Sequence, residues 1–125
     1  MTATWKIELI PVPVTDVDRA KAFYQKLGFN ADHDYPVRDG LRFVQLTPPG
    51  SACSIVIGEG ITEKAPGSQE IQIVVADAEA ARRQVLDAGV EASEIDVQPW
   101  GSFVRFRDPD GNLWSLQAIE RRPNG

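Results

Sequence analysis

The sequence predicts an α+β domain made of two copies of one βαβββ module, and three observations lead to this fold class. First, the chain resembles itself when it is shifted by 61 residues, as Val14 and Val75 illustrate (75 − 14 = 61). Second, capping residues at equal spacing flank one helical pattern in each half. Third, each helical pattern precedes short strand patterns that are separated by turns. A length of 125 residues fits one domain, spanning residues 1–125.

The self-similarity needs no gaps in the sequence, and it aligns mainly turn and capping residues. The matches are Val14 with Val75, Asp16 with Asp77, Ala20 with Ala81, Gly28 with Gly89, Gly40 with Gly101, Pro48 and Gly50 with Pro109 and Gly111, and Ser54 with Ser115. Asp16 and Asp77 stand where a carboxylate can accept the free N–H groups of a helix start. Gly28 and Gly89 stand where a left-handed residue ends a helix. The spacing therefore predicts helices of equal length.

Each half is predicted as a strand, a helix and three strands. In the first half the helix covers residues 17–27 and the strands cover 7–14, 31–37, 41–47 and 52–57. The second half repeats this plan and closes with a strand at 113–118 after the turn Asp108-Pro109-Asp110-Gly111-Asn112. Module one is expected at about residues 5–58 and module two at about 67–119. The segment 58–68 is predicted to be a loop or linker.

Charge and composition exclude several classes of partner. A net charge of −5 leaves no basic surface for nucleic acid or anionic lipid. No apolar stretch approaches the roughly 18 residues of a membrane span, and the first residues do not resemble a secretory leader, so a cytoplasmic location is predicted. Cys53 is the only cysteine, which rules out an internal disulfide and favours a buried structural thiol.

Four motifs at the helices and turns are informative together: Val14-x-Asp16-x-Asp18-Arg19-Ala20, Phe23-Tyr24, Leu27-Gly28-Phe29 and Phe106-x-Asp108-Pro109-Asp110-Gly111-Asn112. In this order they resemble the vicinal oxygen chelate superfamily, which includes glyoxalase I, ring-cleaving dioxygenases and bleomycin-resistance proteins, and the resemblance covers nearly the whole chain. It implies two modules whose curled mixed sheets enclose a shared cavity, and it implies a homodimer. It does not imply one activity, because this fold carries several unrelated chemistries.

Enzymes of that family hold a divalent metal between the modules, on the first and last strand of each. The corresponding positions here are Leu9, Ser54, Glu70 and Ser115. A leucine and two neutral hydroxyls do not replace the imidazole and carboxylate ligands that a catalytic metal needs, so no metal and no other cofactor is predicted. One alternative is a bulge at Pro11 or Pro13 that turns Glu8 inward beside Glu70.

His33, the only histidine, lies in the polar stretch Asn30-Ala31-Asp32-His33-Asp34. A metal site of His33 with Asp32 and Asp34 is disfavoured, because adjacent side chains on a strand point to opposite faces. A solvated histidine is the preferred interpretation.

Strand alternation predicts which residues line the cavity. Ile10, Val12, Val14, Ile71, Ile73 and Val75 are expected under the helices, so the opposite face carries Leu9, Pro11, Pro13, Ser54, Val56, Glu70, Gln72, Val74, Ser115 and Gln117. Trp100, in a loop, is expected to cover a ligand by stacking, with aromatic packing as the alternative. Apolar groups with a few polar ones suit a small organic ligand. The alternative is that the polar groups bond to each other or to water.

The lining and the family resemblance together suggest two functions from different classes. The first is a protein that binds or sequesters a small organic compound without a metal, as bleomycin-resistance proteins do. The second is an enzyme, a lyase, isomerase or dioxygenase, either with unusual metal ligands or metal-free with Glu70 as general base. Against the second, Glu70 can equally be a solvated glutamate at a strand end. A third option is an interaction module with a vestigial cavity.

Overall fold

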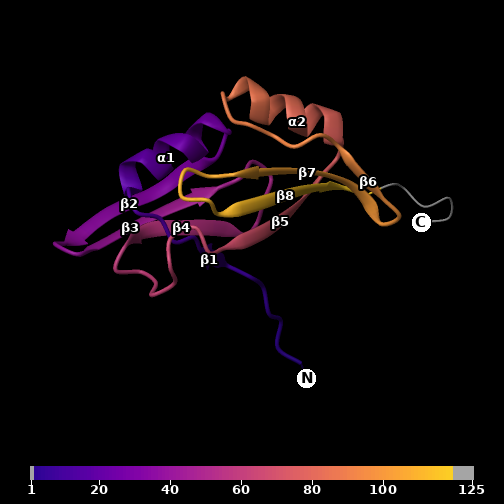
Figure 1. Cartoon of the computed structure of the whole chain (residues 1–125). Helices are drawn as coiled ribbons and strands as arrows, with labels where there is room; N and C mark the ends of the chain where they lie inside the picture. The colour runs from indigo at the N-terminus through magenta and orange to yellow at the C-terminus, as the bar shows by residue number, and fades with distance from the viewer. Residues whose placement is uncertain (1, 120–125) are drawn as a thin grey trace.

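A computed structural model describes residues 2–119 and contains two βαβββ modules in tandem, which confirms the predicted fold class (Figure 1). The first module consists of β1 (Leu9–Pro11), α1 (Val17–Lys26), β2 (Asn30–Arg38), β3 (Leu41–Thr47) and β4 (Ser54–Glu59). The second consists of β5 (Glu70–Val75), α2 (Ala78–Asp87), β6 (Asp96–Gln98), β7 (Gly101–Arg107) and β8 (Leu113–Ala118). The first strand is shorter than the predicted 7–14. No helix in the described part of the chain is both long and apolar enough to cross a membrane.

Each module forms its own four-stranded mixed sheet. The strand orders are β1-β4-β3-β2 and β5-β8-β7-β6, with β1 parallel to β4, β5 parallel to β8, and the remaining pairs antiparallel. Both helices lie on one side of the strands in Figure 1, and the N-terminal segment leaves on the other side. Within residues 2–119, β1 and β5 each pair with a single neighbour, so both are edge strands.

The helix ends follow the capping residues as predicted. Oδ1 of Asp16 accepts a hydrogen bond from the backbone N–H of Arg19 at 3.1 Å, and Asp77 caps α2 in the same way. Gly28 and Gly89 follow the helices with φ values of +102° and +81°, a conformation that favours glycine. The two helices therefore start 61 residues apart, at Val17 and Ala78.

The gap-free repeat is wrong beyond the helices. In the last buried pair before the β3–β4 loop, Leu46 lies opposite Ile55, and in the second sheet Phe106 lies opposite Trp114. These counterparts are 60 and 59 residues apart (106 − 46 and 114 − 55) rather than 61. Relative to the first module, the second module is one residue shorter between its helix and β7, and its loop before β8 is shorter by one more residue. The structural counterpart of Ser54 is consequently Leu113, because Leu9 pairs with Ser54 and Glu70 with Leu113.

The core is shared by the two modules. Tyr24 and Phe29 of the first module pack against Trp114 of the second, with ring centroids 5.6 Å apart in both cases. Phe106 stacks on Trp114 at 6.1 Å. The helix-facing sides of both sheets thus meet in one hydrophobic cluster.

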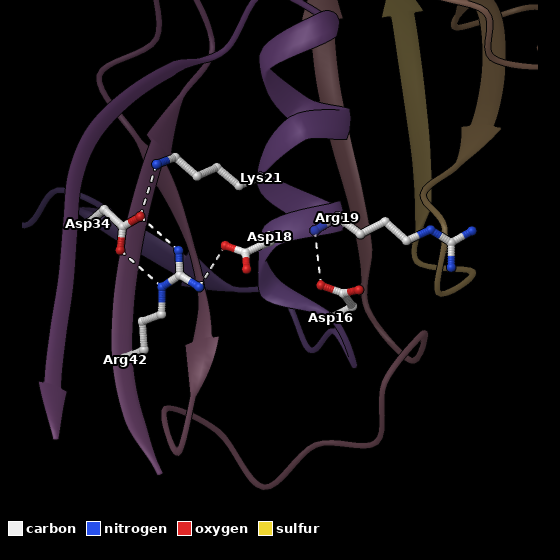
Figure 2. A network of polar contacts seen from close by, with 6 residues as sticks. All are labelled: Asp16, Asp18, Arg19, Lys21, Asp34 and Arg42. Carbon is white, nitrogen blue, oxygen red and sulfur yellow. Dashed lines mark hydrogen bonds and ion pairs between the residues drawn. The ribbon is translucent and has the colours of Figure 1, made fainter. Parts of the chain in front are cut away.

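A network of ion pairs ties α1 to β2 and β3 (Figure 2). Arg42 donates two hydrogen bonds to the Asp34 carboxylate, at 3.0 and 2.8 Å, and its Nη1 lies 2.9 Å from Asp18. Lys21 on α1 adds a 2.9 Å contact to Asp34. The Asp34 side chain is 26% exposed, so this bidentate pair is partly shielded from water.

Replacing Asp34 with asparagine is expected to lower the melting temperature at pH 7 and to matter less in acid. The hydrogen bonds from Arg42, and then from Lys21, hold the pKa of Asp34 well below its ordinary value of 3.8. When the pKa of a carboxyl is lower in the folded than in the unfolded state, the folded state gains its full stabilisation at pH values above the unfolded-state pKa. This stabilisation is lost as the pH falls through the folded-state pKa. The gap between wild type and Asp34→Asn should therefore narrow below pH 3.8. Thermal melts between pH 7 and pH 2 measure it.

Asp39→Asn is the matched control, because no hydrogen bond or ion pair involves the Asp39 carboxylate among the described residues. A gap between Asp34→Asn and wild type that stays constant across this pH range would mean that charge is not the reason for the loss.

Candidate functional site

The predicted ligand-facing residues lie on the face of each sheet that points away from its own helix, here called the helix-distal face. In the first sheet this face carries Ser54 and Val56, both buried, alongside Leu9 and Pro11 of β1. Their neighbours Ile55 and Ile57 point into the core. The first sheet therefore brings together four of the predicted residues.

Ser54 is held in a polar network within the first sheet. Gln45 Nε2 donates to its hydroxyl at 3.1 Å, and the hydroxyls of Ser54 and Thr47 are 2.6 Å apart. Thr47 also donates to Asp32, and this hydrogen bond, followed by one from Asn30, lowers the pKa of the Asp32 carboxyl. The polar groups here satisfy one another, which was the alternative interpretation of the lining.

The helix-distal face of the second sheet carries a chain of amides. Gln72 Nε2 donates to Gln117 Oε1 at 2.6 Å, and Gln117 Nε2 donates to the carbonyl oxygen of Trp100 at 2.8 Å. Ser115 lies opposite Gln72 in the ladder. The Trp100 side chain is 64% exposed, so its ring is available to a ligand or a partner.

Glu70 lies at the start of β5, opposite Leu113 and two residues before Gln72. Its side chain is exposed, and among residues 2–119 its carboxylate accepts no hydrogen bond. The half-buried surroundings expected for a general base are not found around Glu70 in this single chain.

Arg105 and Phe103 belong to the same face and were missed in the sequence. The guanidinium of Arg105 lies 5.1 Å from the centroid of the Phe103 ring, and its Nη1 contacts Asp96 at 3.1 Å. Arg105 lies opposite Ser115, next to the amide chain. The signal is the alternation of β7, where Val104 and Phe106 point into the core and Phe103 and Arg105 therefore point to the opposite face.

His33 and Tyr35 form the corresponding aromatic group on the first sheet. Their rings stack with centroids 5.4 Å apart, and both side chains are exposed. They lie opposite Gln45 and Phe43. His33 is therefore solvated, as predicted, and the register shift before it places it beside the polar network of Ser54.

The four family metal positions do not fit a divalent ion. Leu9 offers no donor atom and the Ser54 hydroxyl is engaged by Gln45 and Thr47. Ser115 lies opposite Gln72 rather than Glu70, so the expected two-fold quartet is not formed. The β1–β4 ladder is continuous through Pro11, which leaves no bulge there to turn Glu8 inward. No cluster of three or more potential His, Cys, Asp or Glu ligands occurs within residues 2–119.

A groove runs between the modules along the edge strand β5. It consists of two adjoining cavities, each of about 330 Å³, that share Pro48, Pro49, Ile73, Val74 and Trp114. Ser54, Gln72 and Val74 are the predicted lining residues that reach it. Ile10 and Ile71, expected beneath the helices, line it as well. In the described part of the chain, β5 pairs with no strand on its second edge, which leaves this side of the strand open.

The fold and the site define a duplicated βαβββ domain with polar groups on helix-distal sheet faces and, within residues 2–119, without a recognisable metal-ligand set. The chain belongs to the Glyoxalase/Bleomycin resistance protein/Dioxygenase superfamily, whose family model matches residues 6–116.

Three relatives illustrate the similarity. The chain is 30% identical to TnmS3, an antibiotic binding protein from Streptomyces sp. CB03234, with 96% of this chain and 100% of that chain covered and a TM-score of 0.86. A superfamily member from Sphaerobacter thermophilus DSM 20745 is 27% identical, with 92% and 98% covered and a TM-score of 0.80. The uncharacterized protein YetH of Bacillus subtilis (strain 168) is 29% identical over 116 residues, which are 90% of this chain and 97% of that protein.

Proposed function

We propose that this protein binds or sequesters a small organic molecule on the helix-distal faces of its sheets, without a metal. The observation that carries this proposal is the second face, where the Gln72–Gln117 amide chain adjoins Arg105 over Phe103. Amides that orient a ligand beside an exposed aromatic ring, here that of Trp100, are typical of sites for small organic molecules. The 30% identity with an antibiotic binding protein over nearly the full chain supports the same class of ligand.

A homodimer acting in the cytoplasm is part of this proposal. The edge strands β1 and β5 leave backbone groups without a strand partner, and Val74 and Trp100 expose 67% and 64% of their surface. A second copy would cover these groups and could enclose the ligand. The single cysteine, Cys53, suits a reducing compartment.

Thermal shift with a panel of antibiotics and metabolites tests the binding function. A ligand that prefers the folded state stabilises it by about 2.7 kcal/mol at a concentration 100 times its dissociation constant, so at least one compound is expected to raise the melting temperature by several degrees. Gln117→Ala should reduce that shift, whereas Gln25→Ala on the exposed side of α1 should not. The proposal fails if no compound shifts the melt, or if both variants respond like wild type.

The second candidate function is an enzyme with Glu70 as general base, and the observation in its favour is that, among residues 2–119, this carboxylate accepts no hydrogen bond and so stays available to a ligand. Under this hypothesis a compound that binds is also consumed, and Glu70→Gln abolishes turnover while sparing binding. Elemental analysis separates the metal-dependent form, which needs about one tightly held ion per chain. We expect substoichiometric metal, because Leu9 and Ser54 offer no suitable ligand.

A further inference from the structure

A second cleft lies where α1 meets the other module, away from the groove along β5. It has a volume of about 400 Å³ and is lined by Arg19, Ala22, Phe23 and Lys26 of α1, by residues 88–90 after α2, and by residues 107–109 after β7. The four α1 residues are spaced i, i+3, i+4 and i+7, so they form one face of the helix. This face is directed at the second module, since Phe23 packs against Phe106 with centroids 6.3 Å apart.

Three cations border this cleft without a carboxylate partner. In the part of the chain that the structure describes, no Asp or Glu lies within 4.0 Å of the charged groups of Arg19, Lys26 or Arg107. Arg107 donates only to the carbonyl of Gly111, at 2.9 Å. Within residues 2–119, Lys21, Arg42, Arg82 and Arg105 form ion pairs. Of the seven described cations that form none, three gather at this cleft, whereas Lys6, Arg38, Lys64 and Arg83 lie outside it.

Arg19 and Lys21 lie on different sides of α1, one among the unpaired cations of the cleft and the other among the cations that form ion pairs. Lys21 points to Asp34 in the ion-pair network, whereas Arg19 extends from the opposite side of the helix toward the second module (Figure 2). Asp108 is the one carboxylate among the lining residues. It is 5% exposed, and its oxygens accept from the neutral donors of Tyr24, Asn112 and backbone N–H groups, so it keeps its negative charge and is outnumbered by the three cations.

The floor of the cleft is apolar. Ala22 and Phe23 face Ala88, Val90 and Pro109 across it. Exposed ion contacts alone contribute little to affinity, whereas each methylene group removed from water adds about 0.8 kcal/mol. A ligand that uses both the rim and the floor therefore needs a negative head and an apolar body.

We propose that this cleft binds a small organic anion, a carboxylate, sulfonate or phosphate ester with an aromatic or aliphatic body. The negative group lies between Arg19, Lys26 and Arg107, and the body lies over Phe23. Such a ligand would touch α1 and the second module together, and would stabilise their contact. The cleft is separate from the helix-distal faces, so the test of this site does not depend on whether the proposed function is correct.

Titration with anilinonaphthalene sulfonate, whose fluorescence rises in apolar surroundings, tests this site. Arg19→Gln/Lys26→Gln is expected to bind the probe about tenfold more weakly than wild type, because two of three ion contacts are lost. The control Arg38→Gln/Lys64→Gln has the same net charge and changes cations outside the cleft, so its affinity should stay within about twofold. Sodium sulfate, which has the charge but no apolar body, should compete only at much higher concentration.

Equal losses in the two double variants would overturn the proposal, since binding would then follow net charge alone. Amide chemical shifts of the wild-type protein give an independent measure. We expect the probe to shift the amides of Phe23, Lys26 and Val90. Shifts confined to Ile73 and Val74 would place the probe in the groove along β5 and would also overturn it.

Discussion

Trp114→Ala is expected to lower the free energy of unfolding by about 3–5 kcal/mol. The side chain is 1% exposed and its ring lies within 5.6 Å of Tyr24 and Phe29 and 6.1 Å of Phe106. Its Nε1 also donates to the Tyr24 hydroxyl at 3.0 Å. Truncation leaves a cavity at the junction of the modules, whose walls belong to two sheets and cannot both collapse into it.

Urea unfolding followed by circular dichroism measures this loss, and Trp100→Ala is the matched control. Trp100 is 64% exposed at the β6–β7 turn, so its truncation should cost less than about 1 kcal/mol. We further expect the Trp114→Ala transition to broaden, because the modules unfold as one unit only while their shared core couples them. A Trp114→Ala loss no larger than that of Trp100→Ala would contradict a shared core.

The helices were predictable because their signals are local. Asp16 marks the start of α1 and Gly28 follows its end, and both act through contacts with residues close by in the sequence. Asp77 and Gly89 do the same for α2. Such capping depends on short-range hydrogen bonds and on φ, both of which follow from residue type. The 61-residue repeat therefore predicts the structural counterparts correctly up to the C-terminal end of each helix.

Strand register was not predictable in the same way. Whether Ser115 lies beside Glu70 or Gln72 depends on pairing between strands more than 40 residues apart and on loop length. The loop before β8 has five residues, 108–112, and the one before β4 has six, 48–53. Shifting a strand by two residues keeps the same side chains on each face, so alternation alone does not detect it.

The candidate site was predictable only in part, because some of its contacts follow from strand alternation and others from tertiary packing. Alternation placed Gln72 and Gln117 on one face, and the structure joins them by a hydrogen bond. The groove along β5 is lined by Trp114, which packs against Tyr24 of α1, and this tertiary contact has no local signal in the sequence. Residue type likewise does not reveal that Lys21 is paired while Arg19, two residues away, is not.

Asp108→Asn is expected to lower the free energy of unfolding by about 2–3 kcal/mol. Oδ1 of Asp108 accepts from the backbone N–H groups of Asp110 and Asn112, at 3.0 and 2.9 Å. Oδ2 accepts from the Tyr24 hydroxyl at 2.6 Å and from Asn112 Nδ2 at 2.8 Å. All four partners are donors, so an amide NH2 in place of either oxygen sets donor against donor in a buried site.

The Tyr24 hydroxyl remains a donor throughout the accessible pH range, because burial and then the Asp108 charge raise the pKa of Tyr24 far above its ordinary value. Tyr24→Phe should cost about 1–2 kcal/mol, since it removes one donor from Asp108 and the acceptor of Trp114. The double variant Tyr24→Phe/Asp108→Asn should lose less free energy of unfolding than the two single variants together, because both changes break the same hydrogen bond. Asp110→Asn is the control on the same loop, because the Asp110 side chain hydrogen-bonds only with the exposed Thr15 among residues 2–119. A cost for Asp108→Asn no greater than for this control would show that the buried carboxylate does not hold the modules together.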